Sequence, residues 1–351
     1  MSKKTIISSE AELRSVARHH LANDTILSWN WKNWETPSAK HRADAVLELI
    51  ANGRRRTFDV EFKLRPTARD IDVLTKHERR RPKLLIAPEL SETLIALCRQ
   101  RGISAIDLNG RTWVYSEGLL IDRSPIPGRR YSTSWPALNP FSLKGSRLAR
   151  TLLSNKDRSW SLTELVSRTA LSGGLVSRLL GALEREGWIE KTSRKLVLRR
   201  PKELLDAWAV HDDWTKRTTL RQYSALAKDL EELAARIRDG LASGANRPVF
   251  TQWFAANLRF PYTIAPVVSA YVRDFPSEDL EAALALRQVT DGGRLWLVAP
   301  RDEGVFQETR VVGGFTLACD TQIFLDLHRA GLRGPEQAQA LREWTGFNQD
   351  S

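Results

Sequence analysis

The stretch from Asp44 to Lys63 decides the fold of the first third of this chain. It reads Asp-Ala-Val-Leu-Glu-Leu-Ile-Ala-Asn-Gly-Arg-Arg-Arg-Thr-Phe-Asp-Val-Glu-Phe-Lys. Two runs that favour β-strands flank Asn52-Gly53, a dipeptide typical of a two-residue hairpin turn. With that turn, Asp44 lies opposite Glu61 on the neighbouring strand, and Lys63 follows on the same face of the sheet.

Two carboxylates that face each other on neighbouring strands repel, and a sheet built only for stability avoids them. A divalent cation between Asp44 and Glu61 removes this cost, and Mg²⁺ held by one or two carboxylates can activate water beside a phosphate. The ammonium of Lys63 would neutralise the charge that develops. The alternative is an ordinary charged strand face, because Glu-x-Lys is a common tripeptide and a one-residue slip in register abolishes the pairing.

An acid followed by Glu-x-Lys on the next strand resembles the PD-(D/E)xK restriction-endonuclease-like superfamily. The resemblance implies an α/β domain over residues 1–123, metal ligation by Asp44 and Glu61, and a catalytic role for Lys63. The first helix offers Glu12 as a further acid. The elements expected around the hairpin agree with this fold: a helix after Ser9 to about residue 22, a helix over 68–79, a strand over 84–87, a helix over 91–101 and a strand over 103–108.

Charge is unevenly distributed along the 351 residues, whose formal net charge is +12. Residues 1–140 carry +8, residues 141–215 carry +5 and the remainder carries −1. A basic first two-thirds favours a polyanionic partner, most simply double-stranded DNA. The polar start and the absence of long apolar runs predict a cytoplasmic protein with no membrane segment. Two cysteines far apart indicate neither a disulfide framework nor a zinc site.

Residues 124–146 are rich in proline and serine and predict a linker. Residues 147–200 then predict a winged helix-turn-helix, with three amphipathic helices and a β-ribbon, and this segment resembles bacterial winged-helix regulators. Its alternative role is a three-helix module for protein contacts. The candidate DNA-binding residues lie at the start and outer face of the third helix and in the wing: Ser172, Gly174, Ser177, Arg178, Lys191, Arg194 and Lys195.

The last part of the chain predicts a helical connector over 201–245, with amphipathic helices from Lys202 to Trp208 and from Leu220 to Ile237, and a C-terminal α/β domain over 246–351. No glycine-rich phosphate loop is present there. We expect Asp320 to lie in a turn and Asp326 on the surface of a helix, rather than in a nucleotidyltransferase metal site. The tryptophans between residues 29 and 34 are expected to fill a core rather than stack on bases.

Three features together resemble a family of regulators. They are residues 88–110 ending in Ile-Asp-Leu-Asn-Gly, the winged helix, and the tail Gln-Ile-Phe-Leu-Asp-Leu at 322–327 followed by Gly-Pro-Glu-Gln-Ala at 334–338. This combination is similar to the AbiEi-type antitoxins of type IV toxin–antitoxin systems. The resemblance implies a repressor of its own operon, paired genetically with a nucleotidyltransferase-like toxin. Many winged-helix regulators are homodimers, so a homodimer is a candidate assembly for this chain.

Two hypotheses therefore stand for this α/β plus α chain. In the first, it is a DNA-binding regulator without a cofactor, and the nuclease-like domain is a scaffold or a DNA-contact surface. In the second, it is a Mg²⁺-dependent DNA endonuclease targeted by its winged helix. The first is preferred because no acid from the first helix is assured and the metal site depends on one strand register.

Overall fold

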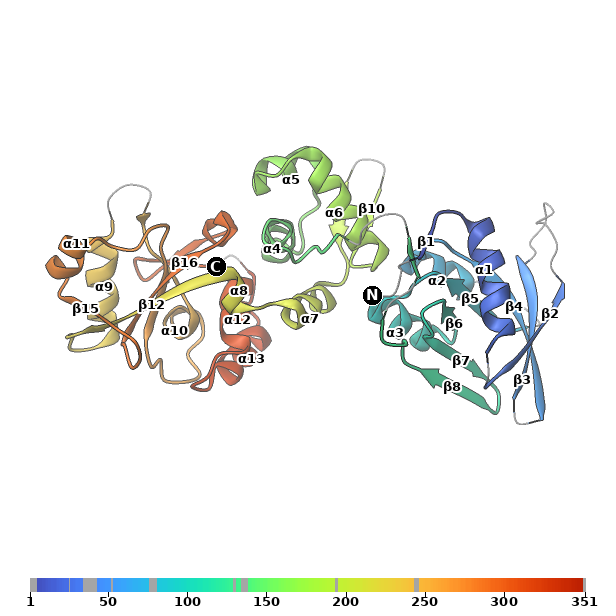
Figure 1. Ribbon diagram of the computed structural model, residues 1–351. Coiled ribbons are helices and arrows are strands. Elements are labelled where there is room, and N and C mark those ends of the chain that lie inside the picture. Colours follow the sequence, from blue (N-terminus) through green and yellow to red (C-terminus); the bar gives the residue numbers. More distant parts are fainter. Residues whose placement is uncertain are drawn as a thin grey trace. The chain divides into compact units, whose positions relative to one another are not determined.

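The computed structural model of the protein describes residues 5–24, 26–33, 43–51, 53–75, 81–128, 131–133, 138–192, 195–242 and 246–349. Most of its elements are labelled in Figure 1. Contacts between Cα atoms divide the chain into two compact units, residues 1–138 with 181–187, and residues 139–180 with 188–351. Within the described residues, no helix is long and apolar enough to cross a membrane.

The N-terminal unit is built on a seven-stranded mixed sheet with strand order β2-β3-β4-β5-β6-β7-β8. Strands β4, β5 and β6 are parallel, and the outer neighbours are antiparallel. A separate parallel pair joins β1 to β9. The elements are β1 (Thr5–Ile7), α1 (Glu10–Ala22), β2 (Ser28–Asn33), β3 (Ala45–Ala51), β4 (Arg54–Phe62), α2 (Ala68–Thr75), β5 (Lys83–Ala87), α3 (Glu92–Arg101), β6 (Ser104–Asp107), β7 (Thr112–Ser116), β8 (Leu119–Arg123) and β9 (Tyr131–Thr133).

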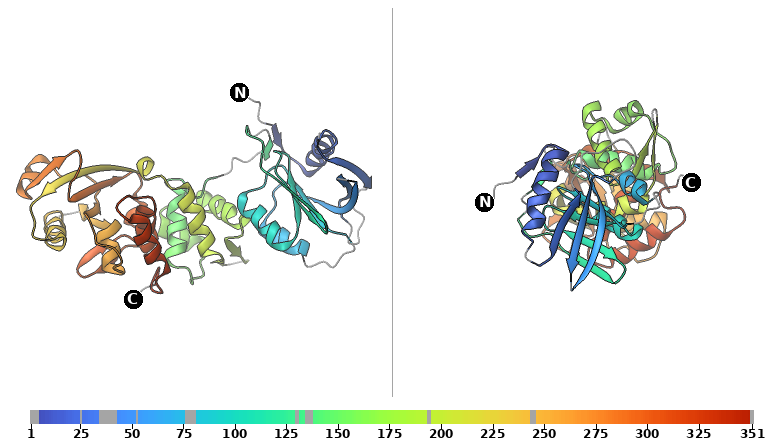
Figure 2. Two further views of the ribbon diagram at one scale, coloured as in Figure 1. Left: turned by 90° about the horizontal axis from the view of Figure 1, so that it is seen from below. Right: turned by 90° about the vertical axis from the view of Figure 1, so that its right-hand side faces the viewer.

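The hairpin has the predicted register, with Ala45 opposite Val60, Leu47 opposite Phe58 and Ala51 opposite Arg54. Leu47 and Phe58 pack in one core cluster with the inner face of α1. On the opposite face of the sheet, α2 and α3 pack on β5 and β6 in a second cluster. The sheet is therefore covered by helices on both faces (Figure 2). The polar face of the hairpin is on the same side of the sheet as α2 and α3.

Local sequence signals fix the helix ends. The Ser9 hydroxyl accepts a hydrogen bond from the Glu12 amide at the start of α1, as expected for an N-cap. Helix α3 begins after Ser91 and ends at Gly102, whose φ of 64° suits glycine. Trp29 is buried and Trp31 is packed against the core, which confirms their expected structural role. Trp34 lies outside the described residues.

The second unit starts with the winged helix-turn-helix: α4 (Gly145–Ser154), α5 (Leu162–Thr169), α6 (Gly173–Arg185), β10 (Ile189–Lys191) and β11 (Leu196–Leu198). Ser161 and Glu164 form the predicted capping box at the start of α5. On α6, the apolar stripe of Val176, Leu179, Leu180 and Leu183 is buried, as its spacing predicts.

The C-terminal part is a seven-stranded sheet of order β15-β12-β16-β14-β13-β18-β17. Its elements are α7 (Pro201–His211), α8 (Trp214–Arg217), β12 (Thr218–Ala225), α9 (Leu230–Gly240), β13 (Val249–Thr251), α10 (Gln252–Arg259), β14 (Val268–Tyr271), α11 (Glu278–Ala283), β15 (Leu286–Val289), β16 (Leu295–Pro300), η2 (Glu303–Phe306), β17 (Arg310–Val312), β18 (Phe315–Leu317), α12 (Asp320–His328) and α13 (Gly334–Glu343).

Two expectations for this part are wrong. The expected helix from Leu220 to Ile237 is instead strand β12 followed by the shorter helix α9, because β12 is inserted between β15 and β16 (Figure 1). Asp320 and Asp326 are buried on α12 rather than exposed, because each forms an ion pair with an arginine distant in sequence. Arg259 pairs with Asp320, and Arg217 pairs with Asp326.

Candidate nucleic-acid interface

The start of helix α6 presents the predicted DNA-binding residues to solvent. Ser172, Gly174, Ser177 and Arg178 are all exposed, whereas Val176 faces the core. The Ser172 carbonyl accepts hydrogen bonds from the amides of Leu175 and Val176, which starts the first turn of the helix. Small residues at this end let a DNA backbone or base edge approach closely.

Arg178 is the cation on this outer face of α6. Its Nε donates to the Gly174 carbonyl at 3.3 Å, so the side chain lies back along the helix toward the N-terminal turn. A guanidinium offers five donors in a planar fork, and this contact uses one of them. The remaining donors can reach phosphate or a guanine edge in the major groove.

The wing is a short antiparallel ribbon in which Ile189 pairs with Leu198 and Lys191 with Leu196. Its tip is closed by Thr192, whose amide and hydroxyl both donate to the Lys195 carbonyl. Lys195 is exposed and Lys191 is half-buried. The predicted contact Arg194 lies outside the described residues. Lysines in such a wing suit phosphate contacts, which position a protein on DNA without reading sequence.

The N-terminal residues predicted to bind metal lie at the open end of the β3–β4 hairpin. Oδ1 of Asp44 accepts a hydrogen bond from Arg14 Nη2 at 2.8 Å, and its Oδ2 accepts one from the Phe62 amide at 2.9 Å. Glu61 Oε1 lies 3.1 Å from Lys63 Nζ. Each carboxylate is therefore paired with a cation of the chain itself.

The charge environment of Lys63 keeps it protonated. Burial opposes its charge, but a hydrogen bond from Lys63 to Glu61 and the charges of Glu61, Asp70 and Glu10 outweigh this and raise the pKa of Lys63 above its ordinary value. Glu10 is thus the acid of the first helix that acts on Lys63. The Glu12 carboxylate instead accepts hydrogen bonds from the amide and hydroxyl of Ser8.

In this arrangement Asp44 and Glu61 are engaged in ion pairs with Arg14 and Lys63 rather than left open to Mg²⁺. A guanidinium in contact with Asp44 repels a divalent cation, and both oxygens of Asp44 already accept hydrogen bonds. Among the residues that the structure describes, no group of three or more histidine, cysteine, aspartate and glutamate side chains is arranged to hold a metal ion. The geometry therefore favours a role for this cluster in joining α1 to the hairpin.

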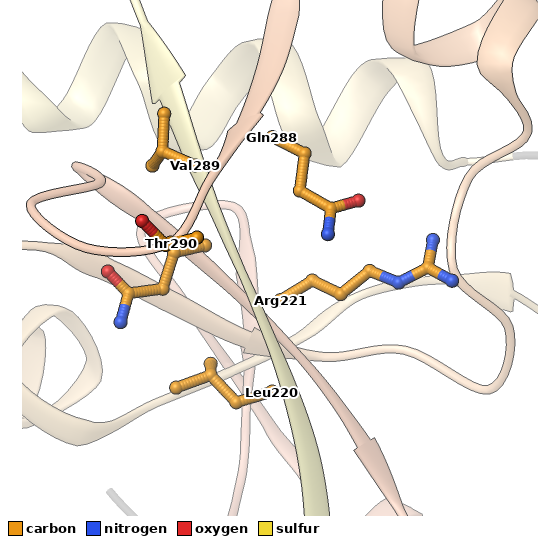
Figure 3. Close-up of a pocket in the computed structure, with 6 residues that line it drawn as sticks. Leu220, Arg221, Gln288, Val289 and Thr290 are labelled. Atoms are coloured by element: carbon orange, nitrogen blue, oxygen red, sulfur yellow. The ribbon is translucent and has the colours of Figure 1, made fainter.

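An open hollow of about 490 Å³ lies beside strands β12 and β15. Figure 3 shows that Leu220, Arg221, Gln288, Val289 and Thr290 line it. The Arg221 guanidinium lies over the Phe275 ring at 4.3 Å, and it is 3.9 Å from Glu281. The lining holds no carboxylate, histidine or cysteine, so nothing in it indicates catalysis.

Comparison with known families confirms the central domain. Residues 151–193 match the IclR helix-turn-helix domain, a span that runs from α4 through α5 and α6 into the wing. Comparisons with curated proteins and with solved structures gave no match. The chain therefore carries an IclR-type helix-turn-helix DNA-binding domain, as is typical of transcription regulators.

Proposed function

We propose that this protein is a transcription regulator that binds its own operator through α6 and the wing, and that it is the antitoxin of a type IV toxin–antitoxin system. The observation that carries the proposal is the open start of α6, where Ser177 and Arg178 are exposed above a fully buried apolar stripe. A helix-turn-helix reads DNA with these N-terminal positions of its last helix.

The wider charge distribution supports DNA as the partner. Residues 141–215, which contain the winged helix, carry a net charge of +5. Lysines in the wing add phosphate contacts on the outer side of the recognition helix. Such contacts supply most of the affinity and make it dependent on salt concentration.

The antitoxin assignment is supported by the resemblance of residues 88–110, 322–327 and 334–338 to AbiEi-type regulators. The N-terminal geometry suits this non-enzymatic role, because Arg14 is bound to the carboxylate that a nuclease would need for metal. In this proposal the nuclease-like domain is a scaffold, and the partner gene encodes a nucleotidyltransferase-like toxin.

The endonuclease hypothesis keeps one observation in its favour. The confirmed hairpin register brings the start of β3 beside the end of β4, so Asp44 and Glu61 lie at the same end of the sheet with Lys63. This second candidate requires Arg14 to leave Asp44 and Lys63 to release Glu61 when metal binds.

The proposed function is tested by fluorescence anisotropy on two duplexes, one with the DNA upstream of the protein's own gene and one scrambled duplex of equal length and composition. We expect tighter binding to the upstream duplex, and a fall in affinity with rising salt. Equal affinity for both duplexes would contradict an operator-specific repressor.

The antitoxin role has its own test. The protein is co-expressed with the toxin encoded beside it, and cell growth is compared with that of cells expressing toxin alone. We expect growth to be restored by the wild-type protein. Growth arrest despite normal levels of the protein would remove the antitoxin assignment while leaving DNA binding intact.

A further inference from the structure

We infer that Glu308 is a positioning residue for DNA binding: its carboxylate fixes the helix-turn-helix on the C-terminal sheet domain. This inference rests on the proposed function and adds the residue that holds the helix-turn-helix domain in place. It starts from the segment between β16 and β17, which contains the short helix η2, packs against α4 and is bonded to Arg168 of α5.

Donors from both helices converge on the Glu308 carboxylate. Arg168 of α5 donates from Nε to Oε1 and from Nη2 to Oε2, each at 2.7 Å. Thr151 of α4 donates to Oε1 and Asn155 donates to Oε2, each at 3.2 Å. One side chain of the C-terminal domain therefore joins the first two helices of the DNA-binding domain to each other and to itself.

The Glu308 carboxylate is the buried member of its ion pair with Arg168. The Glu308 side chain is 4% exposed, whereas the Arg168 side chain is 54% exposed. The carboxylate is therefore enclosed beneath the guanidinium, where low solvent exposure strengthens charge-assisted hydrogen bonds. Burial alone would raise the pKa of Glu308, but hydrogen bonds from Arg168 and Asn155 and the charge of Arg168 hold it below its ordinary value.

The backbone conformation at Glu308 determines which substitution tests its carboxylate. Its φ is +54°, in the left-handed region where a residue with a Cβ is disfavoured and glycine is preferred. Glycine adopts this conformation without strain, so replacing Glu308 by glycine removes the carboxylate without a backbone penalty. The same segment makes a second ionic contact with α4, in which Arg147 Nε and Nη2 each lie 2.8 Å from a carboxylate oxygen of Asp302.

A third contact also joins α4 to the C-terminal sheet domain. Arg150 of α4 is buried, and its Nε and Nη2 donate to Gln322 Oε1 at 3.2 and 2.7 Å. These contacts leave Ser177 and Arg178 of α6 exposed. The C-terminal domain therefore holds α4 and α5 without covering the residues proposed to meet DNA.

Two substitutions at Glu308 distinguish the effect of its carboxylate from the effect of its backbone conformation. Glu308→Gly relaxes the left-handed backbone but removes the carboxylate, and Glu308→Gln keeps the shape but removes the charge. Glu303→Gln is the matched control, because Glu303 lies in the same segment, pairs with Arg273 and does not contact α4 or α5 by any described hydrogen bond. Arg168→Lys keeps the charge of α5 and removes the two-pronged contact.

The decisive measurement is hydrogen exchange of α4 and α5 amides in the free protein, followed by anisotropy titration of the upstream duplex. We expect faster exchange and about tenfold weaker DNA binding in Glu308→Gly, Glu308→Gln and Arg168→Lys, with wild-type behaviour in Glu303→Gln. Wild-type exchange and affinity in the Glu308 variants would overturn the inference. If the wild-type protein binds no DNA, the proposed function fails, and the exchange rates alone decide whether Glu308 holds these helices.

Discussion

Arg14 Nη2 lies 2.8 Å from Asp44 Oδ1, so helix α1 is bound to the start of the hairpin through the carboxylate that a nuclease would use for metal. Arg14 also lies over the Phe62 ring, with its Cζ 5.4 Å from the ring centre. The arginine is thus held by a charge on one side and an aromatic face on the other. A divalent cation at Asp44 Oδ1 would have to compete with the Arg14 guanidinium, which the Phe62 ring helps to hold in place.

We therefore expect no DNA cleavage by the wild-type protein with Mg²⁺ or Mn²⁺. Supercoiled and linear DNA are the substrates, and Lys63→Ala and Asp44→Asn are the comparison variants. All three proteins should leave the DNA intact, because the carboxylates are paired with Arg14 and Lys63. Cleavage by the wild type that disappears in both variants would identify an enzyme and reverse our preference.

Arg178→Ala should weaken binding to the upstream duplex by about 1–3 kcal/mol if the guanidinium contacts a base edge. A phosphate contact would instead weaken binding to all duplexes alike and lower the salt slope by about one. Anisotropy titrations at several salt concentrations distinguish these outcomes. The control is Arg199→Ala, which removes an exposed cation that pairs with Glu190 at the base of the wing, away from its tip. Equal affinities for Arg178→Ala and wild type would refute the assignment of α6 as the recognition helix.

Asp326→Asn should destabilise the C-terminal domain by about 3–5 kcal/mol, because it leaves a buried network without its central charge. Asp326 is fully buried and accepts hydrogen bonds from Thr251, Tyr271, Arg217 and Gln322. Urea unfolding followed by circular dichroism measures the loss. Asp291→Asn, an exposed substitution in a turn, is the control and should change stability little. A loss no greater than that of the control would show that the network contributes little.

The buried carboxyl of Asp107 predicts a pH dependence of the N-terminal domain. Burial raises the pKa of Asp107 to about 6, against hydrogen bonds from the amides of Arg111, Leu90 and Asn109. The ordinary pKa is 3.8, so between pH 3.8 and about 6 Asp107 is protonated in the folded domain but ionised in the unfolded chain. This contribution is present below pH 4 and is lost as the pH rises through 6, with a total of about 3 kcal/mol.

Urea unfolding gives the free energy of unfolding of wild type and Asp107→Asn from pH 4 to about 7. The difference between the two slopes of this free energy against pH measures the contribution of Asp107. Asp122→Asn is the control, because Asp122 lies on β8 of the same domain and is about half exposed beside Arg99. We expect the wild type to lose stability relative to Asp107→Asn as the pH rises. Parallel curves would show that Asp107 does not titrate in this range.

Short-range signals predicted much of this architecture because each rests on a few adjacent residues. The Asn-Gly dipeptide predicted the hairpin register, although Asn52 itself lies outside the described residues. Ser161 with Glu164 predicted a capping box, and apolar spacing predicted the inner face of α6. These features depend on local backbone geometry. These three features could therefore be inferred without knowing the distant neighbours of each element.

The features that sequence reasoning missed depend on partners far along the chain. Arg14 gives no signal until α1 lies against the hairpin, although its place one turn after Glu10 puts it near the same end of the helix. Asp320 and Asp326 were expected at the surface because charged residues usually are, and only their arginine partners make burial tolerable. Strand β12 contains threonine and tyrosine, but an apolar period extending into α9 favoured a helix.

The position of β12 determines how the protein can be divided for study. This strand pairs with β15 on one side and with β16 on the other. A fragment that begins at residue 246 would lack it, leaving β15 without its neighbour and the edge of β16 open to other chains. Such a fragment should self-associate, whereas a piece that begins before Thr218 retains every strand of the sheet.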